Sequence, residues 1–366
     1  MNSSGLRPER HPGMVLALIL VSYFMIVLDN SIIFTGLPEI QTALGLGATS
    51  SAWVQNAYTL VFGGLLLLGA RIGDLLGRQR VFVVGLAIFG LASLLVGTAQ
   101  NEVWLIAARA FQGIGAAIVA PTSLSLITAP FPAGPQRTRA VAAYGTTAGL
   151  GASLGLLVGG ALASWVSWRA GFFINGPIAG LMIVGAVRYL PHFPREQGRF
   201  DVWGALASTV GMGALVFGII NAGETGWGSV NTLVPLLVGA LVLGLFVANE
   251  ARVGQPIMPL RLFASRQRGG AAIARLMFAG TMIAFFFFLT QFFQGVYGWT
   301  PLQAGLGFLP MTLVQFVLSL FVPRLTRRFG NAALVAVGLG LVFAGIAWMS
   351  QLSADSSYLV GLLARW

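Results

Sequence analysis

Long apolar stretches recur along this chain and constrain its fold more than any other feature. A bilayer core is crossed by about 20 apolar residues in helical form, so each such stretch predicts a membrane-spanning helix. We expect an all-α polytopic membrane protein with eleven spans and the stub of a twelfth, which begins near Tyr358 and stops at Trp366. The eleven expected spans are 14–36, 50–70, 80–99, 104–127, 139–161, 170–190, 202–222, 231–249, 270–294, 303–323 and 332–352.

Charge is scarce and unevenly placed. Only 8% of the residues are charged, against about 25% in soluble domains. With the N-terminus on the cytoplasmic side, the arginines of the connecting segments collect on the inner side, and only Arg169 lies in an outer loop. This asymmetry predicts a multi-pass protein of the cytoplasmic (plasma or inner) membrane with a cytoplasmic N-terminus. The net charge of +11 then follows from topology, and we expect no nucleic-acid partner.

Reactive and metal-binding side chains are few. The chain has no cysteine, and its two histidines, His11 and His192, are far apart in sequence. No arrangement typical of a catalytic or metal site is present, so we expect no enzyme activity, no catalytic residue, no metal and no cofactor.

Two polar connectors, 191–201 and 250–269, divide the chain. They predict a six-helix bundle at 1–190, a two-helix insertion at 191–250 and an incomplete C-terminal bundle at 251–366. A repeat supports this division, because ARIGDLLGR after the second span resembles PRLTRRFGN after the tenth. Repeated halves are how many transporters build a binding site near the membrane midplane.

Asp29 and Arg109 are the two charges placed deepest in the expected spans. At about 1.5 Å per residue, Asp29 lies about 22 Å above the cytoplasmic start of its helix, and Arg109 about 20 to 25 Å. Charges at one depth can pair, and intramembrane charges mark functional sites by default. One interpretation is a proton switch, since burial favours the protonated carboxyl group and a nearby arginine favours the carboxylate. The other is a static ion pair that fixes helix packing.

The loop after the second span carries two glycines and several charges, namely Gly73, Asp74, Gly77, Arg78 and Arg80. Glycine permits a tight reversal, and an aspartate can accept hydrogen bonds from arginine or from a helix N-terminus. The loop is therefore a candidate cytoplasmic gate between helices. The alternative is an ordinary positively charged inner loop.

Glycines dominate the fifth span, in which Gly151, Gly155 and Gly159 recur every fourth residue and Gly160 follows. That spacing places small residues on one helix face and predicts close helix contact, either fixed or moving.

Polar and aromatic groups at membrane depth form a further set. Such groups tend to face the interior of a helix bundle. The residues that we expect to line a cavity are Gln55, Tyr58, Gln112, Phe292 and Gln294.

These motifs together resemble the major facilitator superfamily, and within it the fourteen-span drug:proton antiporters. The resemblance covers nearly the whole chain, through LDNSIIFTGLP (28–38), ARIGDLLGRQR (70–80), RAFQGIGAA (109–117), GASLGLLVGG (151–160), Asn175-Gly176-Pro177 and QGVYGWTPLQAGLGFLP (294–310). It departs where Phe34 replaces the usual asparagine and Leu156 the usual proline.

The resemblance implies a major-facilitator-type bundle of 6 + 2 + an incomplete second six-helix half. It also implies proton-coupled efflux of small amphipathic molecules such as drugs, dyes or antibiotics by alternating access, with Asp29 as the proton site and Arg109 as its partner. The expected partners are a small-molecule substrate and the lipid bilayer, and we favour a monomer. Family members of this class continue for about three more helices, so we expect a truncated or frameshifted product or a fragment. The alternative function is a non-transporting remnant or a sensor on the same scaffold.

Overall fold

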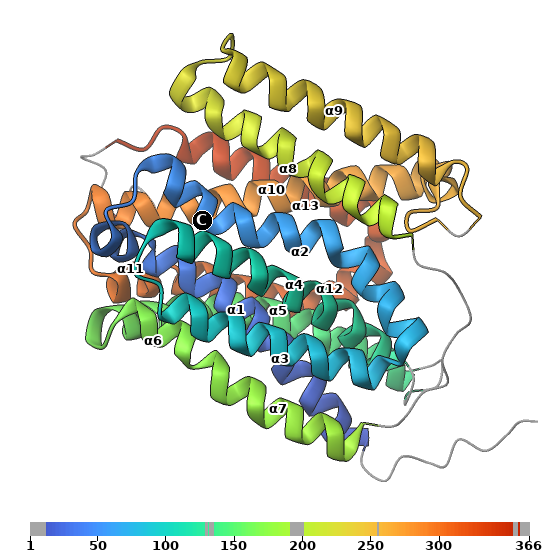
Figure 1. Ribbon diagram of the computed structural model, residues 1–366. Helices are drawn as coiled ribbons and strands as arrows, with labels where there is room; N and C mark the ends of the chain where they lie inside the picture. The colour runs from blue at the N-terminus through green and yellow to red at the C-terminus, as the bar shows by residue number, and fades with distance from the viewer. Residues whose placement is uncertain are drawn as a thin grey trace, which may run out of the picture.

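A computed structural model describes residues 12–128, 131, 135–190, 201–254, 256–353 and 358 (Figure 1). Within these ranges the regular elements are helices. His11 and His192, the start of the predicted insertion at 191 and, apart from Tyr358, the predicted stub of a twelfth span lie outside the described residues.

Ten helical segments of the described chain are long and apolar enough to cross a membrane. The prediction of an all-helical polytopic membrane protein is therefore confirmed. These segments lie in α1 (Pro12–Leu44), α2 (Ala48–Leu76), α3 (Arg78–Gly97), α4 (Glu102–Thr128), α5 (Pro135–Trp165), α6 with α7 (Trp168–Phe173 and Asn175–Tyr189), α8 (Val202–Thr225), α9 (Val230–Glu250), α10 (Arg266–Gly295) and α13 (Asn331–Met349).

The predicted span 303–323 is built from two helices, α11 (Pro301–Gly307) and α12 (Leu309–Phe329). Thr300 and Gln303 begin α11 with a reciprocal capping box. The two helices are separated at Phe308, two residues before Pro310. Proline has no N–H to donate to the carbonyl four residues earlier, so the regular ladder of hydrogen bonds cannot continue through this point.

The first two helices are longer than predicted. Helix α1 continues past residue 36 to Leu44 with Pro38 inside it, and α2 continues past residue 70 to Leu76. A proline inside a helix removes one hydrogen bond but need not end the helix. Thr42 Oγ1 donates to the Pro38 carbonyl at 3.0 Å in the turn that follows.

The first six spans pack around a common interior. Helix α1 packs against α5, α2 against α4, and α3 against both α4 and α7. In a bilayer, helix association depends on close van der Waals packing rather than on exclusion of water. Buried aromatic residues Tyr58, Phe82 and Phe89 belong to one core cluster of this interior together with Met25.

The glycines of α5 form the face that contacts α1, as their spacing predicts. A methyl group on Gly151 would lie 3.0 Å from Val27, one on Gly155 2.6 Å from Ser31, and one on Gly159 2.8 Å from the Ile32 Cα. Larger residues would push the two helices apart. Gly160 points elsewhere, since a methyl group there would meet the Pro301 carbonyl oxygen of α11.

The pair α8 and α9 lies on one flank of the bundle, with α9 outermost (Figure 1). Helix α8 packs against α2. Trp53 of α2 lies 6.0 Å, centroid to centroid, from Phe217 of α8, and a methyl group on Gly64 would clash with Thr209. The division of the chain at 1–190, 191–250 and 251–366 stays a prediction.

Candidate functional site

Asp29 of α1 and Arg109 of α4 meet in the interior of the first six spans. Arg109 Nη1 lies 2.8 Å from Asp29 Oδ2, and both side chains are 0% exposed. The matched depths derived from the sequence thus correspond to a direct contact. A charge at this depth is tolerated when it is paired, and here each charge is the other's partner.

Two amide side chains complete the hydrogen bonding of the carboxylate. Gln112 Nε2 donates to Asp29 Oδ1 at 2.8 Å, and Asn175 Nδ2 donates to the same oxygen at 2.7 Å. Gln112 Nε2 also lies 2.6 Å from Ser93 Oγ. The carboxylate is therefore surrounded by donors from α4 and α7, with α3 supporting one of them.

Arg109 is positioned by contacts of its own. Its Nε donates to the Val54 carbonyl of α2 at 3.1 Å, and Nη1 also donates to Gln112 Oε1 at 2.6 Å. The guanidinium carbon lies 4.4 Å from the centroid of the Tyr58 ring and 6.0 Å from that of Phe172. Cation–π contacts of this kind stabilise a desolvated arginine. Nη2 makes no hydrogen bond with any described residue.

The arrangement is chemically specific. Charge-assisted donors from Arg109 and neutral donors from two amides all favour the ionised carboxyl group. The three hydrogen bonds use three of the about four lone-pair positions of the carboxylate, and a proton on Asp29 would remove the charge that attracts Arg109. The charge state of Asp29 therefore sets the strength of its contacts with α4 and α7.

Sequence reasoning identified the charges of this cluster and missed part of their setting. Gln112 was expected to line a cavity, and the structure places it, 0% exposed, beside the carboxylate. Its position three residues after Arg109 on one helix face was a usable signal. Asn175 was noted only as part of a family motif. Ser93 carried no signal, because a lone serine in an apolar helix commonly bonds the carbonyl four residues earlier, as Ser93 does to Phe89.

Of the remaining expected cavity residues, Gln55 and Tyr58 lie on α2 and Phe292 and Gln294 lie on α10. Gln55 Nε2 donates to Asn30 Oδ1 at 2.9 Å, and Tyr58 is fully buried with no hydrogen-bond partner for its hydroxyl among the described residues. Gln294 Nε2 of α10 donates to the Thr35 carbonyl of α1 at 3.0 Å. The Phe292 ring packs edge-to-face against the Tyr297 ring, with the centroids 4.9 Å apart. Their role as cavity lining stays a prediction.

The segment expected as a gate loop is mostly helical. Gly73 and Asp74 belong to the last turn of α2, Arg78 begins α3, and Gly77 alone joins the helices, with φ at 102°. Arg78 pairs with Asp74 at 2.9 Å and reaches the Ser125 carbonyl of α4 at 3.4 Å. These contacts connect the ends of three helices.

Arg80 is exposed on α3. Its predicted part in the gate stays untested.

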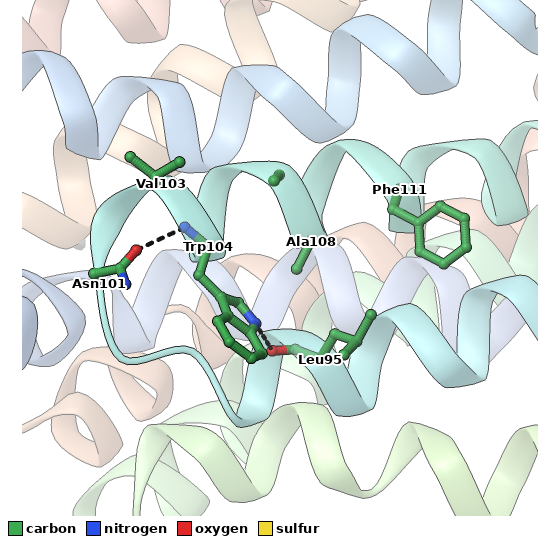
Figure 2. A pocket seen from close by; sticks show the side chains of 7 residues that line it. Leu95, Asn101, Val103, Trp104, Ala108 and Phe111 are labelled. Atoms are coloured by element: carbon green, nitrogen blue, oxygen red, sulfur yellow. Dashed lines mark hydrogen bonds between the residues drawn. The ribbon is translucent and has the colours of Figure 1, made fainter.

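A surface pocket of 540 Å³ lies on α3 and α4, close to where the chain passes from one to the other. Figure 2 shows Trp104 in its wall, with the indole N–H bonded to the Leu95 carbonyl at 2.9 Å. Residues of the Asp29 cluster do not line it. Its walls are apolar apart from Asn101, and the pocket is therefore separate from the charged site.

Comparison with known proteins identifies one superfamily of transporters both by family model and by individual relatives. The family model described as Major Facilitator Superfamily matches residues 19–364. A cephamycin export protein of Amycolatopsis lactamdurans is 40% identical, with coverage of 95% of this chain and 73% of the relative. A puromycin resistance protein of Streptomyces alboniger is 39% identical, with coverage of 97% and 71%.

Among solved structures, the crystal structure of the peptide transporter POT in complex with sulfate superposes with a TM-score of 0.65 at 16% identity. The match covers 94% of this chain and 74% of that one. At this identity the likeness concerns the fold alone.

Proposed function

Because the chain belongs to the major facilitator superfamily, we propose that it exports small amphipathic molecules, such as drugs, dyes or antibiotics, in exchange for protons. Its family and relatives are transporters rather than enzymes. The names of the relatives, which concern cephamycin export and puromycin resistance, support efflux of natural products as the direction and class of transport. Coupling to protons is the finer part of the proposal and rests on the site.

The observation that carries the proposal is the buried carboxylate of Asp29 among three donors from α4 and α7. Arg109, Gln112 and Asn175 all reach it within 2.8 Å. In one half of the cycle Asp29 is ionised and paired with Arg109. In the other half a proton neutralises it, and Arg109, which already lies over the Tyr58 ring, is free to turn toward substrate.

A cytoplasmic gate is the second element of the proposed mechanism. Arg78 holds Asp74 of α2 and the Ser125 carbonyl of α4. An inner opening that separates the ends of α2, α3 and α4 would have to break these contacts. The arginine distribution supports placing this end, and the N-terminus, on the cytoplasmic side of the cell membrane.

The test uses the purified 366-residue chain in sealed vesicles loaded with a pH-sensitive dye, with ethidium as the transported probe. Wild type is expected to move protons when ethidium is added and to move ethidium when a pH gradient is imposed. Asp29→Asn should abolish both the proton movement and the ethidium movement while the protein remains in the membrane, since an amide side chain cannot exchange a proton near neutral pH.

Glu102→Gln is the matched control, because Glu102 is an exposed acid at the start of α4 that bonds Ser50. It should behave as wild type. If ethidium movement in wild type does not depend on the pH gradient, proton antiport is contradicted and facilitated transport without coupling is indicated. No movement in wild type would favour a non-transporting scaffold.

A further inference from the structure

A second pair of acidic side chains lies at the end of the α8–α9 pair where α8 begins and α9 ends. Asp201 precedes α8, and Glu250 is the last residue of α9. Asp201 is 9% exposed and Glu250 3% exposed. Acidic residues are almost never buried to this degree without a partner for the charge.

The four carboxyl oxygens of the pair have unequal environments. Asp201 Oδ1 accepts from the Gly204 N–H at 2.8 Å, and Oδ2 accepts from the Asn249 amide at 3.1 Å. Glu250 Oε2 accepts from the Met258 N–H at 2.6 Å. Glu250 Oε1 is buried and has no hydrogen-bond partner among the described residues.

This unpartnered oxygen faces the other carboxyl group. A methyl group on Gly204 would lie 2.5 Å from Asp201 Oδ2 and 2.9 Å from Glu250 Oε1. Both oxygens therefore border the same small space above Gly204. A glycine at this position leaves room for the two carboxyl groups to approach each other.

Within the described part of the chain, no positive charge is paired with either of these two carboxyl groups. Asp201 is the charged group that faces Glu250, and the backbone N–H groups of Met258 and Ile257 also lie against its carboxyl group. Asp201 is faced by Gly204 and Asn249. Arg252 and Arg261 are exposed, and within the described part of the chain neither forms an ion pair with this couple.

We propose that Asp201 and Glu250 form a proton-binding site, in which one proton bridges Glu250 Oε1 and Asp201 Oδ2. Two carboxyl groups at one buried site cannot both ionise without a large cost, and a shared proton removes that cost. A metal ion fits poorly, because three of the four oxygens already accept from N–H groups, whereas Ca²⁺ and Mg²⁺ require about six oxygen ligands.

The bridging proton has a structural consequence for the chain that follows. Through its bond to the Met258 N–H, Glu250 holds residues 256–258 against the end of α9, and these residues lead through η1 (Leu260–Leu262) into α10. With the proton bound, the ends of α8, α9 and this connector are fastened together. Without it, two like charges repel and the connector is released. This inference goes beyond the proposed transport and does not depend on it.

The test compares the thermal stability of full-length wild type, Glu250→Gln and Asp201→Asn in detergent from about pH 5 to about pH 8. A group that holds its proton in the folded state but loses it on unfolding makes stability fall as pH rises. Wild type should lose about 2 to 4 °C in Tm more than Glu250→Gln over this range. The glutamine keeps an N–H donor for Asp201 at every pH.

Glu102→Gln serves as the control and should keep the wild-type dependence. The same pH dependence in Glu250→Gln as in wild type would overturn the proposal. A second measurement avoids reliance on folding of the variants. Infrared spectra of wild type at neutral pH should contain a protonated carboxyl band that is absent from Glu250→Gln and retained in Asp29→Asn, and no such difference would also overturn it.

Discussion

Removal of the Arg109 guanidinium should lower the stability of the folded chain, because it leaves the buried Asp29 carboxylate without a countercharge. In Arg109→Gln, Asp29 keeps the two amide donors but loses its countercharge in a site where both side chains are 0% exposed. Breaking one side of a buried ion pair costs about 3 to 5 kcal/mol. For a chain of this size that corresponds to a fall in Tm of roughly 4 to 7 °C.

The assay is a double-mutant cycle on the purified chain in detergent. Thermal unfolding is followed for wild type, Arg109→Gln, Asp29→Asn and the double variant, all at neutral pH and one detergent concentration. The double variant has no unpaired charge, so it should recover most of the loss and unfold within about 2 to 4 °C of wild type.

The reasoning fails if the effects of the two substitutions simply add. Additivity would mean that Asp29 and Arg109 do not interact energetically, despite the 2.8 Å contact between them. It would also fail if Arg109→Gln unfolded as wild type does.

Three further predictions follow from the packing and the site. Gly155→Leu should lower Tm by several degrees in a thermal scan, because a side chain there meets α1 at 2.6 Å. Gly145→Leu is the control and should leave Tm unchanged, since nothing lies within 4 Å of that position. Equal effects of the two substitutions would contradict the packing of α5 against α1. Gly77→Ala should destabilise by about 1 kcal/mol in denaturant titrations, because its φ of 102° strains any residue with a Cβ; an unchanged midpoint would refute this. Asn175→Leu removes one donor to Asp29 and should slow proton-coupled ethidium movement in vesicles at least tenfold without loss of protein from the membrane. A wild-type rate in this variant would show that Asn175 does not position Asp29.

Much of the site could be predicted because membrane depth restricts where charges can be. Counting residues along two helices was enough to bring Asp29 and Arg109 to one level, since the helical rise is constant and the bilayer is of fixed thickness. The glycine face of α5 was predictable for the same reason, because a four-residue period on a helix leaves little choice of partner face.

Other features depend on which helices become neighbours, and no single helix contains that information. Asn175 is 146 residues from Asp29 and reaches it only because α7 packs against α1. The exact extent of α1 was also missed, because Pro38 can either end a helix or be accommodated within one. The break at Phe308 follows from Pro310 once the helix is known to pass through that point.

The ion pair between Asp29 and Arg109 also has an electrical consequence. As the structure has it, the pair is neutral and buried within the first six spans. A proton on Asp29 would leave the positive charge of Arg109 uncompensated inside the low-dielectric region. The work of moving one elementary charge across a membrane is about 2.3 kcal/mol per 100 mV. The resting potential of the cell would therefore exert force on this region only while Asp29 is protonated.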